Sequence, residues 1–290
     1  MIPRDIVDRD IVDRDIADRD IADRDIADRD IADRDISYRD QIDGTPTHRT
    51  HPPGGSFFGR RKGHKLRAHH AGLIEHLLPR LSLDITQNAP HDLTSLFETN
   101  TTHVRLEIGF GGGEHLIAQA QSFPHTGFIG CEPYVNGMAK ILAQIEARNI
   151  SNIRLYAGDA AELLAWMPPR ALSRIDLIHP DPWPKRRHWK RRFVQDETIT
   201  AMARVLRDNG EFRFVCDIDD YSAWTLAHLT RSPDFIWTAE AADDWRRPWA
   251  GYTMTRYGAK ATREGRAAIY LIFRKLSQSD PSLAITPNAG

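Results

Sequence analysis

Residues 104–113 read Val-Arg-Leu-Glu-Ile-Gly-Phe-Gly-Gly-Gly, in which apolar residues alternate with charged ones before a glycine-rich turn. The alternation predicts a strand, and residues 114–121 behind the turn predict a helix. Glycines at a strand-to-helix turn let the backbone adopt positive φ angles and approach a ligand closely. The turn therefore marks a ligand site or, as the alternative, a purely structural change of chain direction.

The spacing of this turn is E-x-G-x-G-x-G, with Glu107 followed by Gly109, Gly111 and Gly113. It differs from the dinucleotide pattern G-x-G-x-x-G, whose third glycine comes one position later and which needs no acid at the strand end. A carboxylate two residues before the first glycine can accept a hydrogen bond from a cationic amino group. We therefore expect these residues to bind the methionine part of S-adenosyl-L-methionine rather than a pyrophosphate.

From residue 104 onward the chain alternates between strand and helix patterns. The expected strands are 104–108, 127–131, 153–156, 175–178 and 211–215, and the expected helices between them are 114–121, 135–147, 160–166 and 198–206. This alternation predicts a Rossmann-like α/β fold, a central mostly parallel sheet with helices on both faces. Residues 253–257 and 267–274 are expected to add an antiparallel C-terminal edge, and residues 71–81 a helix.

Two more carboxylates follow predicted strands. Glu132 ends the second strand, 25 residues after Glu107, where an acid in dinucleotide sites binds ribose hydroxyls. Asp159 follows the third strand and is a candidate for the adenine edge, with capping of the next helix as the alternative. Because open α/β sheets bind ligands at the carboxyl ends of their strands, the three acids together predict a cofactor site there.

The fourth strand runs into residues 179–192, His-Pro-Asp-Pro-Trp-Pro-Lys-Arg-Arg-His-Trp-Lys-Arg-Arg. Three prolines restrict φ and stiffen this turn, so Asp181 and Trp183 are expected at the mouth of the cofactor site, where they suit a purine. Six of the eight residues 185–192 are Lys or Arg, which predicts phosphate binding, with a solvated surface as the alternative. The predicted nucleic-acid backbone contacts in this strip are Arg186, Arg187, Lys190, Arg191 and Arg192.

A second basic stretch precedes the sheet. Residues 57–67 contain five Lys or Arg and two phenylalanines. Arg60, Arg61 and Lys62 are its predicted contacts to a nucleic-acid backbone. Cations beside aromatic rings suit phosphates and unstacked bases. A flexible, solvated linker explains the composition equally well.

The composition of the 290 residues is ordinary for a globular protein, with 41% hydrophobic and 27% charged residues. Two cysteines exclude a disulfide-rich scaffold, neither a Cys-x-x-Cys pair nor the histidine spacing indicates a metal, and no apolar run is long enough to span a membrane. The charged N-terminus lacks the apolar core of a secretory signal. We expect a cytoplasmic protein without metal or membrane contact.

The N-terminus repeats Arg-Asp-Ile every five residues from Arg4 to Arg34. Five residues advance about 500° on a helix, so successive isoleucines line no face, and on a strand they alternate between faces. We expect residues 1–43, whose net charge is −7, to be disordered, either without function or as an acidic tail that mimics RNA. The rest of the chain carries +6, which hints at a polyanionic partner.

Together these stretches resemble the bacterial-type tRNA (guanine-N7)-methyltransferases, from about residue 57 to residue 274. The matching stretches are 60–63 (Arg-Arg-Lys-Gly), 106–113, 130–133 (Gly-Cys-Glu-Pro), 158–160 (Gly-Asp-Ala) and 180–185 (Pro-Asp-Pro-Trp-Pro-Lys). The last is highly specific to the family, whereas the rest of the core is shared with many methyltransferases. The resemblance implies a class I methyltransferase fold and an enzyme that transfers the methyl group of S-adenosyl-L-methionine to N7 of guanosine 46, in the variable loop of tRNA. The implied partner is tRNA, without an obligate protein partner.

The expected organisation follows from these features: the repeat over 1–43, a basic arm and helix over 44–81, the methyltransferase domain over 82–276 and a flexible tail over 277–290. The resemblance places Glu107, Glu132, Asp159 and Asp181 at cofactor-binding positions, with Asp181 also at the catalytic one. Its substrate-binding positions fall on Lys185, Asp217, Thr255, Arg256, Tyr257 and Gly258.

The chain departs from the family at three positions. A threonine commonly precedes the aspartate where this chain has Cys216 before Asp217. The family usually has an acid where this chain has Gly258, so an acceptor for guanine or for a neighbouring residue is missing, and it usually has an apolar residue where this chain has His179. Two alternatives stay open. One is another S-adenosylmethionine-dependent nucleobase or small-molecule N-methyltransferase, and the other is a tRNA-binding protein of the same fold with reduced or lost catalysis.

Overall fold

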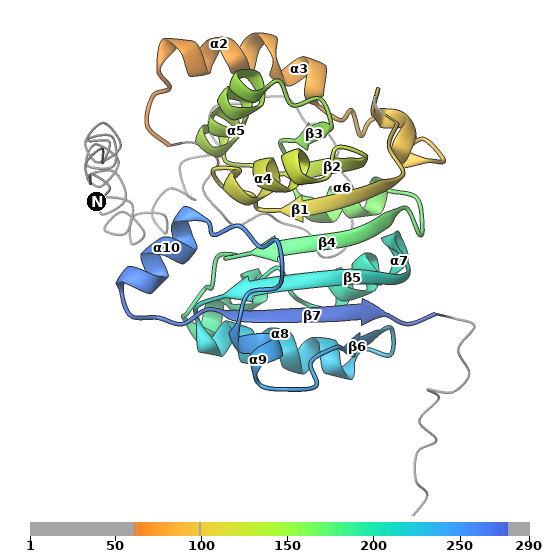
Figure 1. Cartoon of the computed structure of the whole chain (residues 1–290), viewed down its shortest axis with the longest axis vertical. Coiled ribbons are helices and arrows are strands. Elements are labelled where there is room, and N and C mark those ends of the chain that lie inside the picture. Colours follow the sequence, from red (N-terminus) through yellow and green to blue (C-terminus); the bar gives the residue numbers. More distant parts are fainter. Residues whose placement is uncertain (1–60, 62, 99, 278–290) are drawn as a thin grey trace, which may run out of the picture. The chain divides into compact units, whose positions relative to one another are not determined.

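A single mixed sheet runs through the part of the chain that the structure describes, a computed structural model of residues 61, 63–98 and 100–277 (Figure 1). In spatial order its strands are β3 (Ile153–Tyr156), β2 (Thr126–Cys131), β1 (His103–Ile108), β4 (Leu172–Ile178), β5 (Leu206–Cys216), β7 (Ile269–Lys275) and β6 (Phe235–Trp237). The pairs from β3 to β5 are parallel, whereas β7 runs antiparallel to both β5 and β6. The predicted Rossmann-like sheet with an antiparallel C-terminal edge is confirmed, and its strand order is that of a class I methyltransferase.

The strand order reverses in the middle of the sheet, between β1 and β4. From β1 the chain moves outward to β2 and β3, and then returns to place β4 on the other side of β1. Glu107 of β1 is therefore paired with Gly130 of β2 and with Asp176 of β4. Ligands bind open sheets beyond the carboxyl ends of the strands at such a reversal. In Figure 1, α10 (Arg256–Arg263) lies beside this edge.

Helices cover both faces of the sheet. The helices α2 (Ala68–His76), α4 (Glu114–Ser122) and α5 (Val135–Arg148) pack on one face, and α6 (Ala160–Trp166), α7 (Asp196–Val205) and α8 (Asp219–Arg231) on the other. Phe128 of β2 is buried with Ile141 of α5, whereas the next residue, Ile129, is buried with Leu163 of α6. Successive residues of a strand point to opposite faces, so strands buried on both sides read as unbroken apolar runs.

Two sequence-based predictions of elements were wrong. The expected helix over residues 71–81 is broken, because α2 ends at His76 and the short α3 (Leu78–Leu81) begins anew with Pro79 in its first turn. The expected strand over residues 253–257 is instead a loop and the start of α10, so only the second half of the expected C-terminal pair, residues 267–274, contains a strand, β7. The short turns η3 (Leu93–Leu96), η4 (Arg186–Arg191) and α9 (Asp243–Arg246) complete the described elements.

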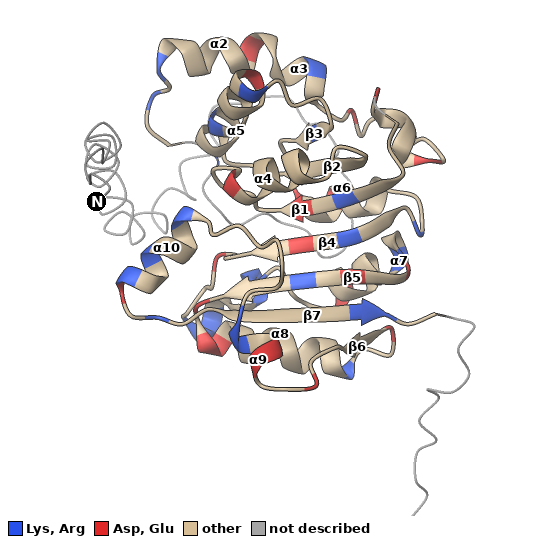
Figure 2. Ribbon diagram, in the orientation of Figure 1, with Lys and Arg blue, Asp and Glu red and all other residues tan. Residues whose placement is uncertain are grey.

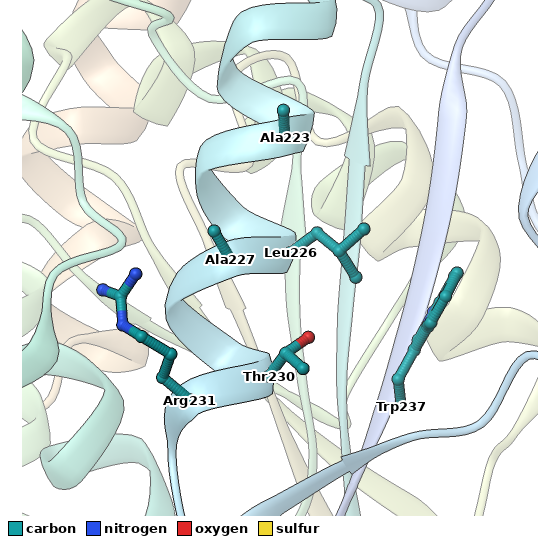
Figure 3. Close-up of a pocket in the computed structure, with 6 residues that line it drawn as sticks. All are labelled: Ala223, Leu226, Ala227, Thr230, Arg231 and Trp237. Carbon is teal, nitrogen blue, oxygen red and sulfur yellow. The ribbon is translucent and has the colours of Figure 1, made fainter.

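A pocket lies between α8 and β6, away from the predicted site (Figure 3). It is lined by Ala223, Leu226, Ala227, Thr230 and Arg231 of α8 and by Trp237 of β6. Because α8 starts at the carboxyl end of β5 and runs back along the sheet, its last turns lie toward the opposite edge. In the described part of the chain, no helix is both long enough and apolar enough to cross a membrane.

Candidate functional site

The glycine-rich turn between β1 and α4 has the backbone that its sequence predicts. Gly109, Gly111 and Gly113 have φ angles of 70°, 57° and 83°, in the left-handed region that favours glycine. Gly109 N donates to the carbonyl of Cys131 (2.8 Å), which ties the turn to β2. A Cβ atom on Gly109 would meet nothing within 4 Å, whereas one on Gly113 would lie 2.7 Å from Ile141. Gly113 thus lets α5 pack, and Gly109 leaves open backbone for a ligand.

Glu107 is buried at the end of β1, beside a histidine that sequence reasoning missed. Its Oε2 lies 2.8 Å from Nδ1 of His115, in the first turn of α4, and both side chains are almost fully buried. Burial raises the pKa of the Glu107 carboxyl above its ordinary value, and His115 opposes that rise. The bond holds the carboxylate against the turn. His115 gave no signal in the sequence because it stands within a helix pattern where most positions are simply packed.

A buried polar network continues from this pair along the same face. Arg174 Nε of β4 donates to Asp176 Oδ2 (2.9 Å), and its NH2 group donates to Oε1 of Gln119 in α4 (2.6 Å). Gln119 Nε2 in turn donates to the carbonyl of Gly251 (2.8 Å). Figure 2 shows an acidic and a basic segment, in red and blue, on β4. The network therefore connects α4 and β4 to the loop that leads into α10.

Glu132 follows β2 and holds the glycine-rich turn from the other side. Its carboxylate accepts hydrogen bonds from Gly111 N (2.8 Å) and Tyr134 N (3.0 Å). Burial raises the pKa of Glu132, both N–H donors lower it, the charge of Asp181 raises it and that of Arg256 lowers it. Because the charges of Asp181 and Arg256 act on the Glu132 carboxyl, the turn at residues 179–184 (the proline turn) and the start of α10 lie near the predicted cofactor residues.

Asp159 stands at the same edge of the sheet, after β3. Its Oδ1 accepts a hydrogen bond from Ala161 N (2.9 Å), so it is the N-cap of α6. The capping role considered from the sequence is confirmed. A contact between this half-buried carboxylate and adenine stays a prediction.

The turn after β4 has an uncommon backbone conformation. His179 and Trp183 have φ angles of 49° and 44°, which residues with a Cβ rarely adopt. His179 N donates to the carbonyl of Val215 (2.8 Å), and Arg192 Nε donates to the carbonyl of Pro182 (3.0 Å). Asp181, between these two anchors, is exposed. The proline turn thus presents its carboxylate from a backbone that is held on both sides.

The first turn of α10 lies over the glycine-rich turn. Arg256 Nε lies 4.0 Å from Oε1 of Glu114, at the start of α4. The ring of Tyr257 comes so close to Gly111 that a Cβ atom there would lie 3.2 Å from its Cε2. Residues predicted to bind substrate are therefore next to the turn predicted to bind the cofactor, although about 145 positions separate them in the sequence.

The inner side of α10 meets the proline turn. Thr255 is buried and caps α10, because its Oγ1 accepts a hydrogen bond from Gly258 N (3.2 Å). A Cβ atom on Gly258 would lie 3.1 Å from Nε2 of His179. The other ring nitrogen of His179, Nδ1, lies 3.0 Å from Oδ1 of Asp217, and Oδ2 of Asp217 accepts from Nε of Arg266 (2.7 Å). The hydrogen bond with His179 lowers the pKa of Asp217 to about 2, against the opposing effect of burial and with a further contribution from Arg266.

The basic strip forms the 3₁₀ helix η4 with most of its cations toward solvent. Lys185, Arg186, Arg187 and Lys190 are exposed. Arg191 is half-buried, and its guanidinium lies 5.0 Å from the centre of the Trp183 ring. The exposed cations thus adjoin the proline turn, as their place in the sequence predicts.

Arg192 does not belong with these cations, and the prediction that it contacts the tRNA backbone is wrong. The residue is 2% exposed, and its guanidinium forms an ion pair with Asp220. Trp189, Tyr221 and Trp224 surround it at 4.9, 4.9 and 5.3 Å from their ring centres. A phosphate cannot reach a guanidinium enclosed in this way, so Arg192 serves to anchor the proline turn through Pro182.

Two described residues of the N-terminal arm, Arg61 and Gly63, contact the start of α5. The carbonyl of Arg61 accepts a hydrogen bond from Val135 N (3.0 Å), and Gly63 N donates to Oδ1 of Asn136 (2.9 Å). The exposed Arg61 side chain is thus close to the candidate cofactor site. The predicted contacts Arg60 and Lys62 lie outside the described residues.

Comparisons with known proteins agree with this arrangement. Residues 101–271 match a protein family described as putative methyltransferase. A tRNA (guanine-N(7)-)-methyltransferase of Rhodopseudomonas palustris (strain BisA53) is 76% identical over 221 residues, which cover 76% of this chain and 88% of the relative. Proteins of the same name from Bradyrhizobium diazoefficiens and Nitrobacter hamburgensis are 75% and 69% identical, and the matches cover 76% and 82% of this chain and 93% of each relative. The chain belongs to the tRNA (guanine-N(7)-)-methyltransferase family.

Membership in this family confirms the resemblance seen in the motifs, and with it the predictions of a methyltransferase and of S-adenosyl-L-methionine as its cofactor. In this methyltransferase the structure brings together Glu107, the glycines, Glu132, Asp181, Arg256 and Tyr257 at one edge of the sheet. Sequence reasoning missed His115, Gln119 and Arg266, which act through contacts between distant segments. Among the described residues, no group of three or more His, Cys, Asp or Glu is placed to hold a metal ion.

Proposed function

We propose that this methyltransferase transfers a methyl group from S-adenosyl-L-methionine to N7 of guanosine 46, in the variable loop of tRNA. The observation that carries the proposal is the contact of Tyr257, in the predicted substrate motif, with Gly111, in the predicted cofactor turn. Asp181 also lies near the predicted cofactor turn, and its charge therefore raises the pKa of the Glu132 carboxyl. Base and methyl donor would therefore meet at the carboxyl ends of β1 and β4.

The residues at this edge fit S-adenosyl-L-methionine. Gly109 offers left-handed backbone with open space above it, and the carboxylates of Glu107 and Glu132 stand at the ends of neighbouring strands. Glu107 would bind the amino group of the methionine part, Glu132 the ribose hydroxyls and Asp159 the adenine edge. When bound, the cofactor supplies an electrophilic methyl group.

Guanine N7 carries a lone pair and no proton, so a reaction at this atom needs no general base. The residues of the chain therefore act mainly by orientation. We assign Asp181 to the guanine edge, where its carboxylate would accept a hydrogen bond from N1–H or from the exocyclic amine, and Trp183 to a wall of the base site. Because the turn is held before the base arrives, little freedom remains to be lost when the reactive geometry forms.

The exposed cations around the site are assigned to the tRNA backbone. Phosphate contacts supply affinity and position the RNA without reading its sequence. The assigned residues are Lys185, Arg186, Arg187, Lys190 and Arg191, together with Arg61 and, by the sequence prediction, Arg60 and Lys62. In this proposal residues 82–276 form the catalytic domain, residues 44–81 form the arm that guides tRNA toward it, and the protein acts in the cytoplasm.

Nucleoside mass spectrometry tests the proposal. The full chain is incubated with S-adenosyl-L-methionine and an unmodified tRNA transcript, or with the same transcript carrying adenosine at position 46. We expect 7-methylguanosine from the first transcript and none from the second. Equal 7-methylguanosine from both would place the reaction at another nucleotide, and a different methylated base would favour another nucleobase methyltransferase. Cofactor binding without any methylation would favour the tRNA-binding alternative.

A further inference from the structure

His179 combines two unfavourable features at the start of the proline turn. Its side chain is 3% exposed, and Nε2 is buried without a hydrogen-bond partner among the described residues. Its φ angle of 49° is in a region that costs free energy for a residue with a Cβ. Strained backbone and unpaired buried polar atoms concentrate at functional sites, so both features point to a role for this side chain.

The contacts of His179 join three segments that lie far apart in the sequence. Its backbone N–H donates to Val215 of β5, and its Nδ1 meets Asp217 two residues further on. Asp217 also accepts from Arg266, which follows α10. Because the pKa of Asp217 is about 2, this carboxylate is charged at neutral pH and can only accept, so Nδ1 carries the hydrogen.

Gly258 supplies the space in which the imidazole lies. A Cβ atom at position 258 would be 3.1 Å from Nε2 of His179, 3.3 Å from Cγ of Met254 and 3.6 Å from the hydroxyl of Tyr252. The first of these distances is shorter than an ordinary van der Waals contact of a Cβ atom, so a side chain at 258 and the imidazole at 179 compete for the same volume. The glycine and the histidine therefore form a matched pair.

We propose that His179 is a positioning residue for Asp181. Its hydrogen bond to Asp217 and its fit against Gly258 fix the direction in which the chain leaves β4, and Asp181 follows two residues later. His179 itself touches neither base nor cofactor. The consequences for rate rest on the proposed function, whereas the consequences for the backbone of the turn do not.

Two substitutions separate the side chain from the backbone strain. His179→Gly removes the imidazole and tolerates the left-handed φ, whereas His179→Asn also tolerates this φ and places its Nδ2 donor where Nδ1 stands. We expect His179→Gly to lower the single-turnover methylation rate by roughly 10- to 100-fold, because alignment of the base is lost. The cofactor Kd should stay within about twofold, since Glu107 and Glu132 are on other strands, and His179→Asn should recover most of the rate. His125→Asn, in the exposed loop before β2, controls for the loss of a histidine.

Hydrogen exchange of the free protein tests the same idea without turnover. In His179→Gly, amides of the peptide 179–192 should exchange several-fold faster than in the wild type, while the peptide 109–122 should keep its wild-type exchange. His179→Asn should return the first peptide close to wild type. Gly258→Ala should also lower the methylation rate, because its Cβ atom competes with the imidazole. This loss should be smaller in the His179→Gly background, where the imidazole is gone.

Each result has a separate meaning. Unchanged exchange at 179–192 in His179→Gly would overturn the proposal, whatever the activity. A rate loss that comes with an equal loss of cofactor binding and is not rescued by His179→Asn would overturn it in favour of general destabilisation. A wild-type chain that does not form 7-methylguanosine would refute the proposed function, and the exchange data would still decide the role of His179.

Discussion

At the scale of single residues, Asp181 and Glu132 are neighbouring carboxylates with different surroundings. Asp181 is exposed on the proline turn, whereas Glu132 is buried and bonded to Gly111 N and Tyr134 N. Exposure leaves a carboxylate available to a substrate, while the two backbone bonds make Glu132 part of the cofactor turn. Replacement of Asp181 and of Glu132 should therefore change different properties of the protein.

We expect Asp181→Ala to lower the single-turnover rate by on the order of 100-fold or more, because the base loses its orientation. The cofactor Kd should change far less. Glu132→Ala should weaken cofactor binding and, since it leaves two half-buried N–H donors without their acceptor, lower the free energy of unfolding by about 1–3 kcal/mol. Single-turnover kinetics, cofactor titration and urea unfolding of both variants measure these effects. A wild-type rate in Asp181→Ala would refute its proposed role.

The pH dependence of stability reports on Asp217. Its folded-state pKa of about 2 is below the ordinary value of 3.8, so its contribution to stability is complete above the unfolded-state pKa and is lost as the pH falls toward 2. Urea unfolding of the wild type and of Asp217→Asn should show a constant difference in unfolding free energy above about pH 5. That difference should shrink between roughly pH 4 and pH 2. A difference that does not change with pH would show that Asp217 is not held as a charged acceptor.

At the scale of elements, the arginines at the start of η4 differ in their surroundings from Arg192, which directly follows η4. Arg186 and Arg187 are exposed, whereas Arg192, directly after η4, is enclosed by aromatic rings and bonded to Pro182. A run of like charges therefore divides into cations exposed to solvent and one buried cation that supports the turn. Sequence spacing alone groups all of them as phosphate contacts.

Charge reversal of Arg186 and Arg187 to Glu should weaken tRNA binding and reduce the slope of log K against log salt by about 1.5, because two phosphate contacts are lost. Arg231→Glu, at the far end of α8, should leave this slope unchanged. Arg192→Met should instead lower the free energy of unfolding by on the order of 2 kcal/mol, because buried polar partners lose their cation. Filter binding across a salt series and urea unfolding measure the two effects. An unchanged slope in the double reversal would identify η4 as an ordinary solvated surface.

At the scale of the whole molecule, the acidic repeat and the basic remainder of the chain carry net charges of opposite sign. Residues 1–43 carry −7 and the rest of the chain +6, and the repeat lies outside the described residues. A period of five residues supplies no apolar face for packing. The repeat should therefore add charge without adding stability.

Removal of residues 1–43 should leave the melting temperature within about 2 °C and the cofactor Kd unchanged. At low salt the truncated chain should bind tRNA at least as tightly as the full chain, because an acidic segment that competes for the cations is gone. Thermal melts and tRNA titrations of the two chains measure these effects. A drop of several degrees on truncation would show that the repeat packs on the rest of the protein.

The sequence by itself determined the central sheet, the glycine-rich turn and the family, because these depend on local patterns. Segments of four to seven residues in which apolar side chains recur mark β1 to β4, and the spacing of Glu107, Gly109, Gly111 and Gly113 reflects the backbone angles that a single turn needs. Helix α8 was not predicted from the sequence, because half of its buried positions, Ser222 and Thr225, are polar and its apolar period is therefore weak. Strand β6 has only three residues, too few to show a period.

Only the tertiary structure decided which of these residues meet. Three contacts join segments that are 28 or more positions apart. They are the ion pair of the buried Arg192 with Asp220, the contact of Tyr257 with Gly111 and the packing of His179 against Gly258. Such pairings depend on how helices and loops pack against the sheet, and no period or spacing within one segment records them. The local pattern therefore specified the type of site, whereas packing specified which residues build it and which ones hold it in place.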